Sequence, residues 1–315
     1  MRLLGKRVPL AVRLQVAGAC PNRCAYCEQP DVADDALSSE ELHALLRDLP
    51  GLGCMRVSFS GGEPMLRSDI GALVGACAAL GMAPEMNSCG IQLAARAGEL
   101  VGLRLLKLSL DGPRELHDAL CGREGSYDEV VAAVRAARAL GIPVVLVATI
   151  TRHNVERLDW VLDRAREWDV MAAFQPYKPY RPGVGGCADL LPSPEAMRAA
   201  VERLLLAQRD GAAPLLRNSA VELRRLLSWP DYPRQRCWAG RIFCVVGLDG
   251  RVYPCDRVSI ESALPNVRER GLAHALARLP EPRCGGCGFC GAQALNLALN
   301  LDPRVLGALL RLVAR

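Results

Sequence analysis

The stretch Ala17-Gly18-Ala19-Cys20-Pro21-Asn22-Arg23-Cys24-Ala25-Tyr26-Cys27 carries three cysteines in a short loop. Three thiolates at this spacing can hold three corners of a cubane iron–sulfur cluster and leave the fourth iron open. An open iron can bind a substrate or cofactor, which a fully ligated electron carrier cannot do. The same thiols also suit a zinc site or a redox-active disulfide loop, so the rest of the chain has to decide between these chemistries.

Composition and charge restrict the class of protein. The chain has 315 residues, of which 50% are hydrophobic, enough for one large domain and a smaller one. The net charge of +5 comes without a run of Lys or Arg, so nucleic-acid binding has no support. Basic residues interrupt the amino-terminal segment, so no signal peptide is expected there. No apolar run is long enough to span a bilayer.

The 14 cysteines are unevenly distributed along the chain. Three lie near residue 24 and six lie between residues 237 and 290. Secreted disulfide scaffolds are usually short, whereas this chain is long and has an α/β pattern. Clustered cysteines in such a chain predict metal ligation, and we expect a cytoplasmic location.

Strand-like and helix-like segments alternate through the first two thirds of the sequence, which is typical of βα units around a parallel sheet. Ser38 and Glu41 form a capping box, and Ser126 is expected to cap a later helix. The pattern predicts an α/β fold with a partial (β/α)6, TIM-like barrel over residues 1–210. The expected strands are residues 11–17, 55–60, 82–88, 104–110, 143–150 and 170–175. The expected helices are residues 39–49, 68–80, 91–100, 126–140 and 154–168, with one more after Pro194.

The composition changes after a connecting helix at residues 211–228. Residues 229–295 are rich in Pro, Gly, Cys and Trp, with short strand signals at 242–247 and 251–253. Such an irregular segment is not expected to be stable through apolar burial alone. We therefore expect a small domain that is stabilised by bound metal. A terminal apolar helix is expected within residues 296–315.

Three motifs fall at the carboxyl ends of expected strands, where parallel barrels collect their chemistry. The cysteine loop follows the first strand, and Gly61-Gly62-Glu63-Pro64 follows the second. Ser109-Leu110-Asp111-Gly112 ends the fourth strand. Glycine permits close approach of a backbone, and a glutamate can accept hydrogen bonds from an ammonium group. The motifs therefore predict one binding site on one rim.

The CxxxCxxC spacing, the aromatic residue before its last cysteine and the Gly-Gly-Glu-Pro turn resemble the signature of the radical S-adenosylmethionine (SAM) enzymes. The resemblance implies a [4Fe–4S] cluster whose open iron chelates SAM and whose electron releases a 5′-deoxyadenosyl radical. It implies a flavodoxin- or ferredoxin-type electron donor. The implied cluster ligands are Cys20, Cys24 and Cys27. The implied SAM-binding residues are Tyr26, Gly62, Glu63 and Ser109.

The run from Ser109 to Asp118 resembles the branch that contains anaerobic sulfatase-maturating enzymes and peptide-modifying relatives. In that branch an arginine follows the His-Asp pair by three residues. Here Cys121 occupies that position, and Arg123 is the expected substitute for binding SAM. We interpret His117 and Asp118 as structural residues that cap or hold this loop.

The carboxyl-terminal cysteines resemble the SPASM/Twitch extension of radical SAM enzymes, with a spacing like that of an aminocyclitol dehydrogenase. Six cysteines cannot complete two thiolate-ligated cubanes, but four suffice for one, so we expect a Twitch-like domain with one auxiliary [4Fe–4S] cluster. The expected ligands are Cys237, Cys255, Cys284 and Cys287, with Cys244 and Cys290 as alternates. A structural zinc site on the same thiolates is the competing interpretation.

Asp256 follows an expected ligand directly and is the candidate base that removes a proton during substrate oxidation. Five further cysteines stand in mostly apolar contexts and are expected to be buried small hydrophobes, although Cys187 lies in a Gly-rich loop that could face the site. These five are Cys54, Cys77, Cys89, Cys121 and Cys187.

The leading functional hypothesis is a radical SAM oxidoreductase that dehydrogenates a small metabolite. It rests on residues 1–10, which leave no room for the leader-binding domain that many peptide maturases carry before the barrel. The alternative is a peptide or protein maturase that forms a cross-link or an oxidised residue. A non-catalytic metal-binding scaffold is a distant third hypothesis, supported only by the missing arginine.

Overall fold

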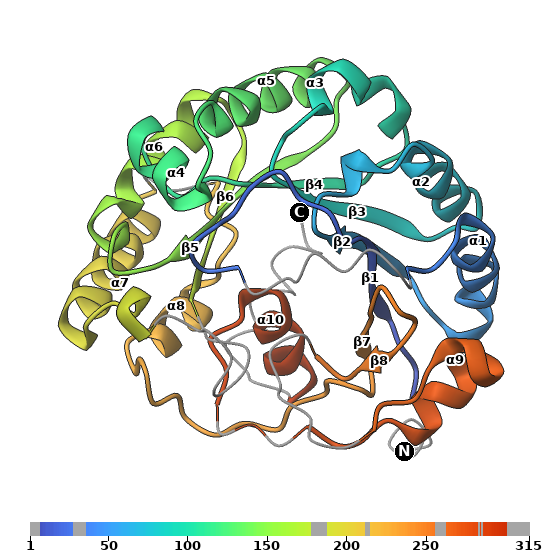
Figure 1. Ribbon diagram of the computed structural model, residues 1–315. Coiled ribbons are helices and arrows are strands. Elements are labelled where there is room, and N and C mark those ends of the chain that lie inside the picture. Colours follow the sequence, from blue (N-terminus) through green and yellow to red (C-terminus); the bar gives the residue numbers. More distant parts are fainter. Residues whose placement is uncertain are drawn as a thin grey trace.

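One curved sheet organises the chain (Figure 1). The computed structural model describes residues 7–27, 36–177, 188–211, 215–255, 263–282, 284 and 286–300. The first strands are β1 (Ala11–Ala17), β2 (Arg56–Gly61), β3 (Ala83–Ser88), β4 (Leu105–Ser109), β5 (Val144–Ile150) and β6 (Met171–Pro176). Each of these strands pairs in parallel with the next one. The predicted α/β class and partial barrel are confirmed.

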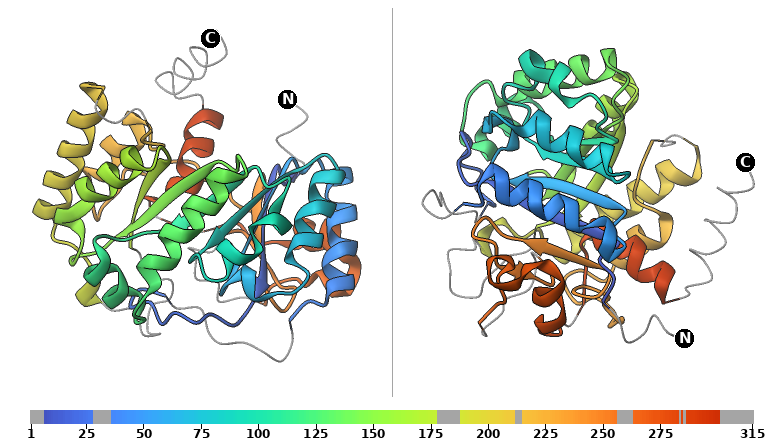
Figure 2. Two further views of the ribbon diagram at one scale, coloured as in Figure 1. Left: turned by 90° about the horizontal axis from the view of Figure 1, so that it is seen from above. Right: turned by 90° about the vertical axis from the view of Figure 1, so that its right-hand side faces the viewer.

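Helices follow the outer side of the sheet (Figures 1 and 2). The capping box of Ser38 and Glu41 opens the first of them, as predicted. Apolar residues of the helices and of alternate strand positions, such as Val12 and Leu14, form one buried core between the two layers. The outer helices are α1 (Ser39–Asp48), α2 (Ile70–Ala79), α3 (Leu93–Arg96), α4 (Arg114–Cys121), α5 (Ser126–Ala139), α6 (Leu158–Glu167), α7 (Pro194–Arg209) and α8 (Ala220–Leu226).

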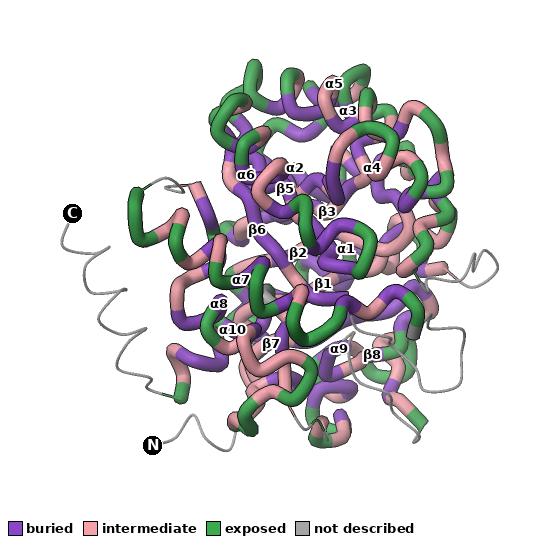
Figure 3. The backbone as a smooth tube through the Cα atoms, turned by 90° about the vertical axis from the view of Figure 1, so that its left-hand side faces the viewer, coloured by how far each residue is buried: buried purple, intermediate pink, exposed green. Residues whose placement is uncertain are grey.

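The strands are buried while the outer turns of the helices face solvent (Figure 3). In β1, Val12, Leu14 and Val16 are buried, whereas the alternating Arg13 and Gln15 are only partly buried. The barrel interior is therefore more polar than the layer between sheet and helices. Among the described residues, no helix combines the length and the hydropathy that crossing a membrane would need.

The carboxyl-terminal segment extends the same sheet. Strand β7 (Phe243–Val246) pairs in parallel with β1, and β8 (Val252–Tyr253) pairs antiparallel with β7. The complete strand order is β6-β5-β4-β3-β2-β1-β7-β8. The segment that the composition marks as a small domain thus shares backbone hydrogen bonds with the barrel strand that leads into the cysteine loop.

Three local features differ from the sequence expectations. Residues 114–121 form α4, which was not predicted because the sequence after the fourth strand is a polar run. Gly125, and not Ser126, occupies the N-cap of α5; Asp118 accepts hydrogen bonds from the backbone N–H groups of Gly125 and Tyr127 and so performs the capping. The carboxyl-terminal segment also contains α9 (Val267–Arg278) and α10 (Cys290–Leu299). A terminal apolar helix is expected within residues 296–315; residues 296–299 belong to α10, and residues 301–315 lie outside the described part of the chain.

Candidate functional site

Two backbone contacts position the cysteine loop at the end of β1. The N–H of Gly62 donates to the carbonyl of Ala17 at 2.6 Å, and the N–H of Glu63 donates to the carbonyl of Ala19 at 2.9 Å. A Cβ atom on Gly62 would lie 2.2 Å from the Ala19 carbonyl oxygen. Glycine is therefore required here, because any side chain would push the cysteine loop away from β2.

The other side of the loop rests on the end of α4. The N–H of Arg23 donates to the carbonyl of Cys121 at 2.8 Å, and the N–H of Ala25 donates to the carbonyl of Leu120 at 2.9 Å. The loop thus lies between the turn after β2 and the helix after β4. Cys20 and Cys24 are half-buried and Cys27 is exposed, so the three sulfurs stand at a rim rather than in the core.

Glu63 is fully buried, and its carboxylate is held by the protein itself. It accepts hydrogen bonds from the N–H of Met65 at 2.9 Å, the hydroxyl of Ser88 at 3.0 Å and the N–H of Cys89 at 2.7 Å. Burial raises the pKa of Glu63. The side chain thus joins the turn after β2 to the end of β3, and its contact with SAM stays a prediction.

Cys89 and Cys121 bring two further thiols to the cysteine loop. A hydrogen bond with Cys89 lowers the pKa of Cys20 to about 7, which favours the thiolate that binds metal. A hydrogen bond with Cys121 and burial together raise the pKa of Cys24. Of these two, Cys121 is buried as expected, whereas Cys89 is only half-buried. Sequence reasoning missed their proximity because each follows a different strand.

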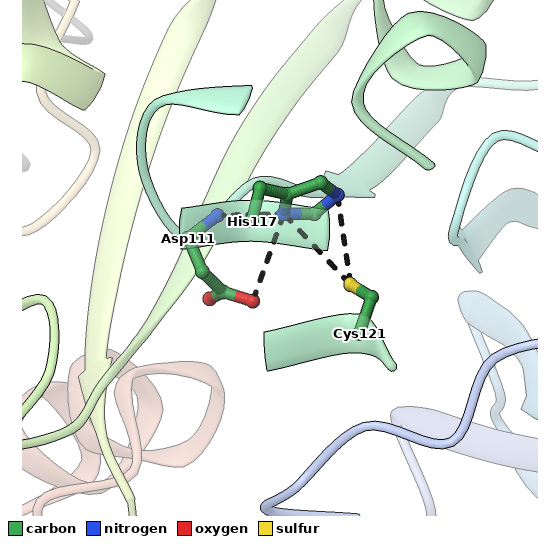
Figure 4. A group of neighbouring side chains, drawn as sticks. All are labelled: Asp111, His117 and Cys121. Atoms are coloured by element: carbon green, nitrogen blue, oxygen red, sulfur yellow. Dashed lines mark hydrogen bonds and ion pairs between the residues drawn. The ribbon is translucent and has the colours of Figure 1, made fainter. Parts of the chain in front are cut away.

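A hydrogen-bonded chain connects the loop to the end of β4, and Figure 4 shows its members Asp111, His117 and Cys121. The hydroxyl of Tyr26 donates to Asp111 Oδ2 at 2.5 Å, and the N–H of Thr149 donates to Asp111 Oδ1 at 2.8 Å. His117 Nδ1 accepts from the N–H of Asp111 at 3.2 Å, so the neutral ring carries its proton on Nε2, 3.6 Å from Cys121 Sγ. Burial lowers the pKa of His117 and raises that of Asp111.

Ligand atoms of Asp111, His117 and Cys121 lie within 4.8 Å of one another, the spacing of a small metal site. However, both carboxylate oxygens and Nδ1 already take part in the hydrogen bonds just described. The trio therefore forms a positioning network beside the cysteine loop. Cys121 contributes its thiol to this network through its contact with His117.

Arg123 is held by other parts of the loop region. Its Nε donates to Asn22 Oδ1 at 2.6 Å, and its guanidinium forms an ion pair with Glu129 of α5. Asn22 in turn donates to the hydroxyl of Ser126 at 3.1 Å. Arg123 thus fastens the cysteine loop to α5. Ser109, the last residue of β4, is paired with Val147 at the same rim. Roles of Arg123 and Ser109 toward SAM stay predictions.

The four cysteines expected to bind an auxiliary cluster line one cavity. Phe243, Phe289 and Trp229 are among its apolar lining residues. Four thiols around an apolar cavity suit a [4Fe–4S] cluster, because such clusters take four thiolates and tolerate burial. These four are Cys237, Cys255, Cys284 and Cys287.

The two alternate ligands differ from these four. Cys244 is buried in the main core on β7, next to Phe243, which faces the cavity. Burial raises the pKa of its thiol, which disfavours the thiolate form. Cys290 begins α10, but its side chain is outside the described part of the structure. Asp256 and Cys187 also lie outside the described residues.

Helix α10 supplies residues that sequence reasoning missed. Asn296 Nδ2 lies 3.7 Å from Cys237 Sγ, and its Oδ1 accepts from the N–H of Trp238 at 3.0 Å. Asn300 accepts from the Trp238 indole N–H at 3.0 Å, and Gln293 donates to the carbonyl of Cys287. Polar residues at this helical spacing within an otherwise apolar segment were the available signal.

The barrel, the rim motifs and the cysteine loop together define a class, and comparison with known proteins agrees. The sequence model of the Radical SAM superfamily matches residues 14–165. A PqqA peptide cyclase from Xanthomonas campestris pv. campestris (strain 8004) is 32% identical over 94% of this chain and 86% of its own length. The chain belongs to the radical SAM superfamily, whose enzymes use a [4Fe–4S] cluster and SAM.

Other relatives and solved structures support the same assignment. A PqqA peptide cyclase from Xanthomonas euvesicatoria pv. vesicatoria (strain 85-10) is 30% identical over 94% of this chain and 87% of its own length. Streptococcus suis SuiB bound to S-adenosylmethionine has a TM-score of 0.70 at 17% identity and covers 85% of this chain. The chain spans 65% of SuiB, slightly less than two thirds. The anSMEcpe structure with bound AdoMet has a TM-score of 0.68 at 19% identity, covering 86% of this chain and 80% of its own. These structures share the fold.

Proposed function

We propose that this radical SAM enzyme modifies a peptide, forming a cross-link or an oxidised residue. The observation that carries the proposal is the similarity to PqqA peptide cyclases, which extends over 94% of the chain and so includes the carboxyl-terminal cavity. This similarity favours the alternative drawn from the sequence over dehydrogenation of a small metabolite. The argument from the short segment before β1 has less weight, because these relatives are peptide cyclases by name.

In this proposal Cys20, Cys24 and Cys27 hold the cluster at the rim. Glu63 and the glycines before it fix the loop from the β2 side, while the chain from Tyr26 to Cys121 fixes it from the β4 side. A [4Fe–4S] cluster held by these cysteines would, when reduced, supply the electron for cleavage of SAM to the 5′-deoxyadenosyl radical. The surrounding residues hold the cysteine loop in place from both sides.

We further propose that Cys237, Cys255, Cys284 and Cys287 hold one auxiliary [4Fe–4S] cluster. The support is their convergence on one cavity that Cys244 does not line. Asp256, next to Cys255 in the sequence, is the proposed base for the proton released on substrate oxidation. Electrons from a flavodoxin- or ferredoxin-type protein and a cytoplasmic location complete the proposal.

The test is an anaerobic reaction of the reconstituted enzyme with SAM, a reductant and the short peptides encoded beside its gene. We expect 5′-deoxyadenosine together with a peptide product whose mass is lower by two hydrogen atoms, measured by mass spectrometry. Conversion of a pathway metabolite with no change in any such peptide would support the dehydrogenase instead.

A further inference from the structure

The aromatic ring of Tyr232 lies directly against the loop that carries Cys284 and Cys287. A Cβ atom on Gly286 would lie 2.6 Å from Tyr232 Cβ, and one on Gly288 would lie 2.3 Å from Tyr232 Oη. The glycines on both sides of Cys287 are therefore needed to admit the tyrosine. The ring extends along this loop, with its hydroxyl beside Gly288.

The hydroxyl of Tyr232 is buried and has no hydrogen-bond partner among the described residues. The same is true of both carboxamide atoms of Gln235, the donor Nε2 and the acceptor Oε1, and both residues line the cavity. Buried donors in native proteins nearly always have acceptors, so unpaired ones indicate a group that belongs beside them. Two unpaired donors in a cavity bounded by four cysteines indicate an acceptor bound by those cysteines.

Other donors already point to sulfur in this region. The backbone N–H of Phe289 donates to Cys287 Sγ at 3.4 Å, and Asn296 Nδ2 lies 3.7 Å from Cys237 Sγ. Thiolates and bridging sulfides are hydrogen-bond acceptors, and each donor that reaches them stabilises the added negative charge of a reduced cluster. Hydrogen bonds to the sulfurs are one of the main determinants of cluster potential.

We propose that the Tyr232 hydroxyl, assisted by Gln235, donates a hydrogen bond to a sulfur of the auxiliary cluster and raises its reduction potential. This inference rests on the proposed auxiliary cluster. Tyr232 then sets part of the potential at which the auxiliary cluster accepts an electron. Gly286 and Gly288 leave the space that the tyrosine side chain needs beside the loop.

The test uses the full chain with Cys20, Cys24 and Cys27 changed to alanine, so that only the auxiliary cluster contributes to the spectrum. Tyr232→Phe removes the hydroxyl and keeps the ring. Tyr127→Phe is the matched control, because Tyr127 lies on α5 against Trp160 and Trp168, away from the cavity. The readouts are iron content and the midpoint potential from an EPR-monitored redox titration.

We expect Tyr232→Phe to retain its iron and to shift the midpoint to a more negative potential, with Tyr127→Phe unchanged. Gln235→Met should shift the potential in the same direction. An unchanged midpoint in Tyr232→Phe with full iron would overturn the inference and leave the auxiliary cluster standing. Loss of iron in that variant would also overturn it, since the residue would then be structural. Absence of iron in the parent protein would refute the auxiliary cluster itself.

Discussion

The hydroxyl of Tyr26 donates a 2.5 Å hydrogen bond to Asp111, which joins the cysteine loop after β1 to the end of β4. Asp111 is fully buried, and its other oxygen accepts from the N–H of Thr149. One carboxylate thus sets the distance between two rim segments that are far apart in the sequence. The placement of the loop depends on this contact as well as on the glycines of the neighbouring turn.

Tyr26→Phe should destabilise the protein by about 1–3 kcal/mol, because it removes one partner of a buried carboxylate and leaves the other in place. The measurement is the free energy of unfolding from urea titration of the cluster-free protein, with cluster retention followed in parallel. Tyr127→Phe on α5 serves as a comparison. Equal stability of Tyr26→Phe and the parent would show that the contact does not hold the loop.

Gly62→Ala should displace the cysteine loop, because its Cβ would meet the carbonyl oxygens of Gly18 and Ala19 at 2.6 and 2.2 Å. We expect loss of most SAM cleavage and of the amino-terminal cluster, measured as 5′-deoxyadenosine and iron. Gly75→Ala is the matched control: Gly75 lies within α2 with open space at the Cβ position. That change should retain activity and add up to about 1 kcal/mol of stability through helix propensity.

Cys24→Ala should abolish SAM cleavage while the auxiliary cluster remains. Cys255→Ala should remove the iron of one [4Fe–4S] cluster and leave uncoupled SAM cleavage measurable, since the two sets of cysteines are separate. Iron, sulfide and zinc analysis after anaerobic reconstitution distinguishes the alternatives. Zinc in place of auxiliary iron would mean that the carboxyl-terminal cysteines are structural.

Cys244→Ala is the control for Cys255→Ala. Its thiol lies in the apolar core and does not line the cavity, so the variant should keep all its iron and lose only stability. If Cys244→Ala lost iron and Cys255→Ala did not, the ligand assignment would have to be exchanged.

The ion pair between Glu41 and Arg268 predicts a pH dependence of stability. It joins α1 to α9 at 2.6 Å, and the hydrogen bond from Arg268 lowers the pKa of Glu41 to about 2. A folded-state pKa below the unfolded value of about 4.3 stabilises the fold at neutral pH, and this contribution disappears as the pH falls towards 2. Both side chains are partly exposed, so the effect should stay below about 1 kcal/mol.

The measurement compares the free energies of unfolding of the parent and Glu41→Gln between pH 7 and pH 3. Their difference should shrink as the pH falls below about 4.3. Arg268→Gln should show the same convergence with the parent. A difference that does not vary with pH would exclude the ion pair as its cause.

The sequence predicts the barrel well because its strands are local apolar segments that alternate with amphipathic helices. The four cysteines that line the cavity could be predicted as one set because their number and spacing are visible in the sequence. By contrast, the pairing of β7 with β1 and the approach of Cys89 to Cys20 depend on tertiary contacts that no local pattern encodes. The role of Tyr232 was not predicted for the same reason. The glycines on both sides of Cys287 were the available signal, because they allow another side chain to pack closely against that loop.

The pairing of Ala11 with Phe243 has a consequence for how the protein is made. The residues of β7 are synthesised long after those of β1, because all the other barrel strands and their helices lie between them in the chain. Pairings between residues so far apart form slowly, and an unpaired strand edge invites association with other chains. The nascent protein therefore carries an open β1 edge beside its cysteine loop until β7 has been synthesised.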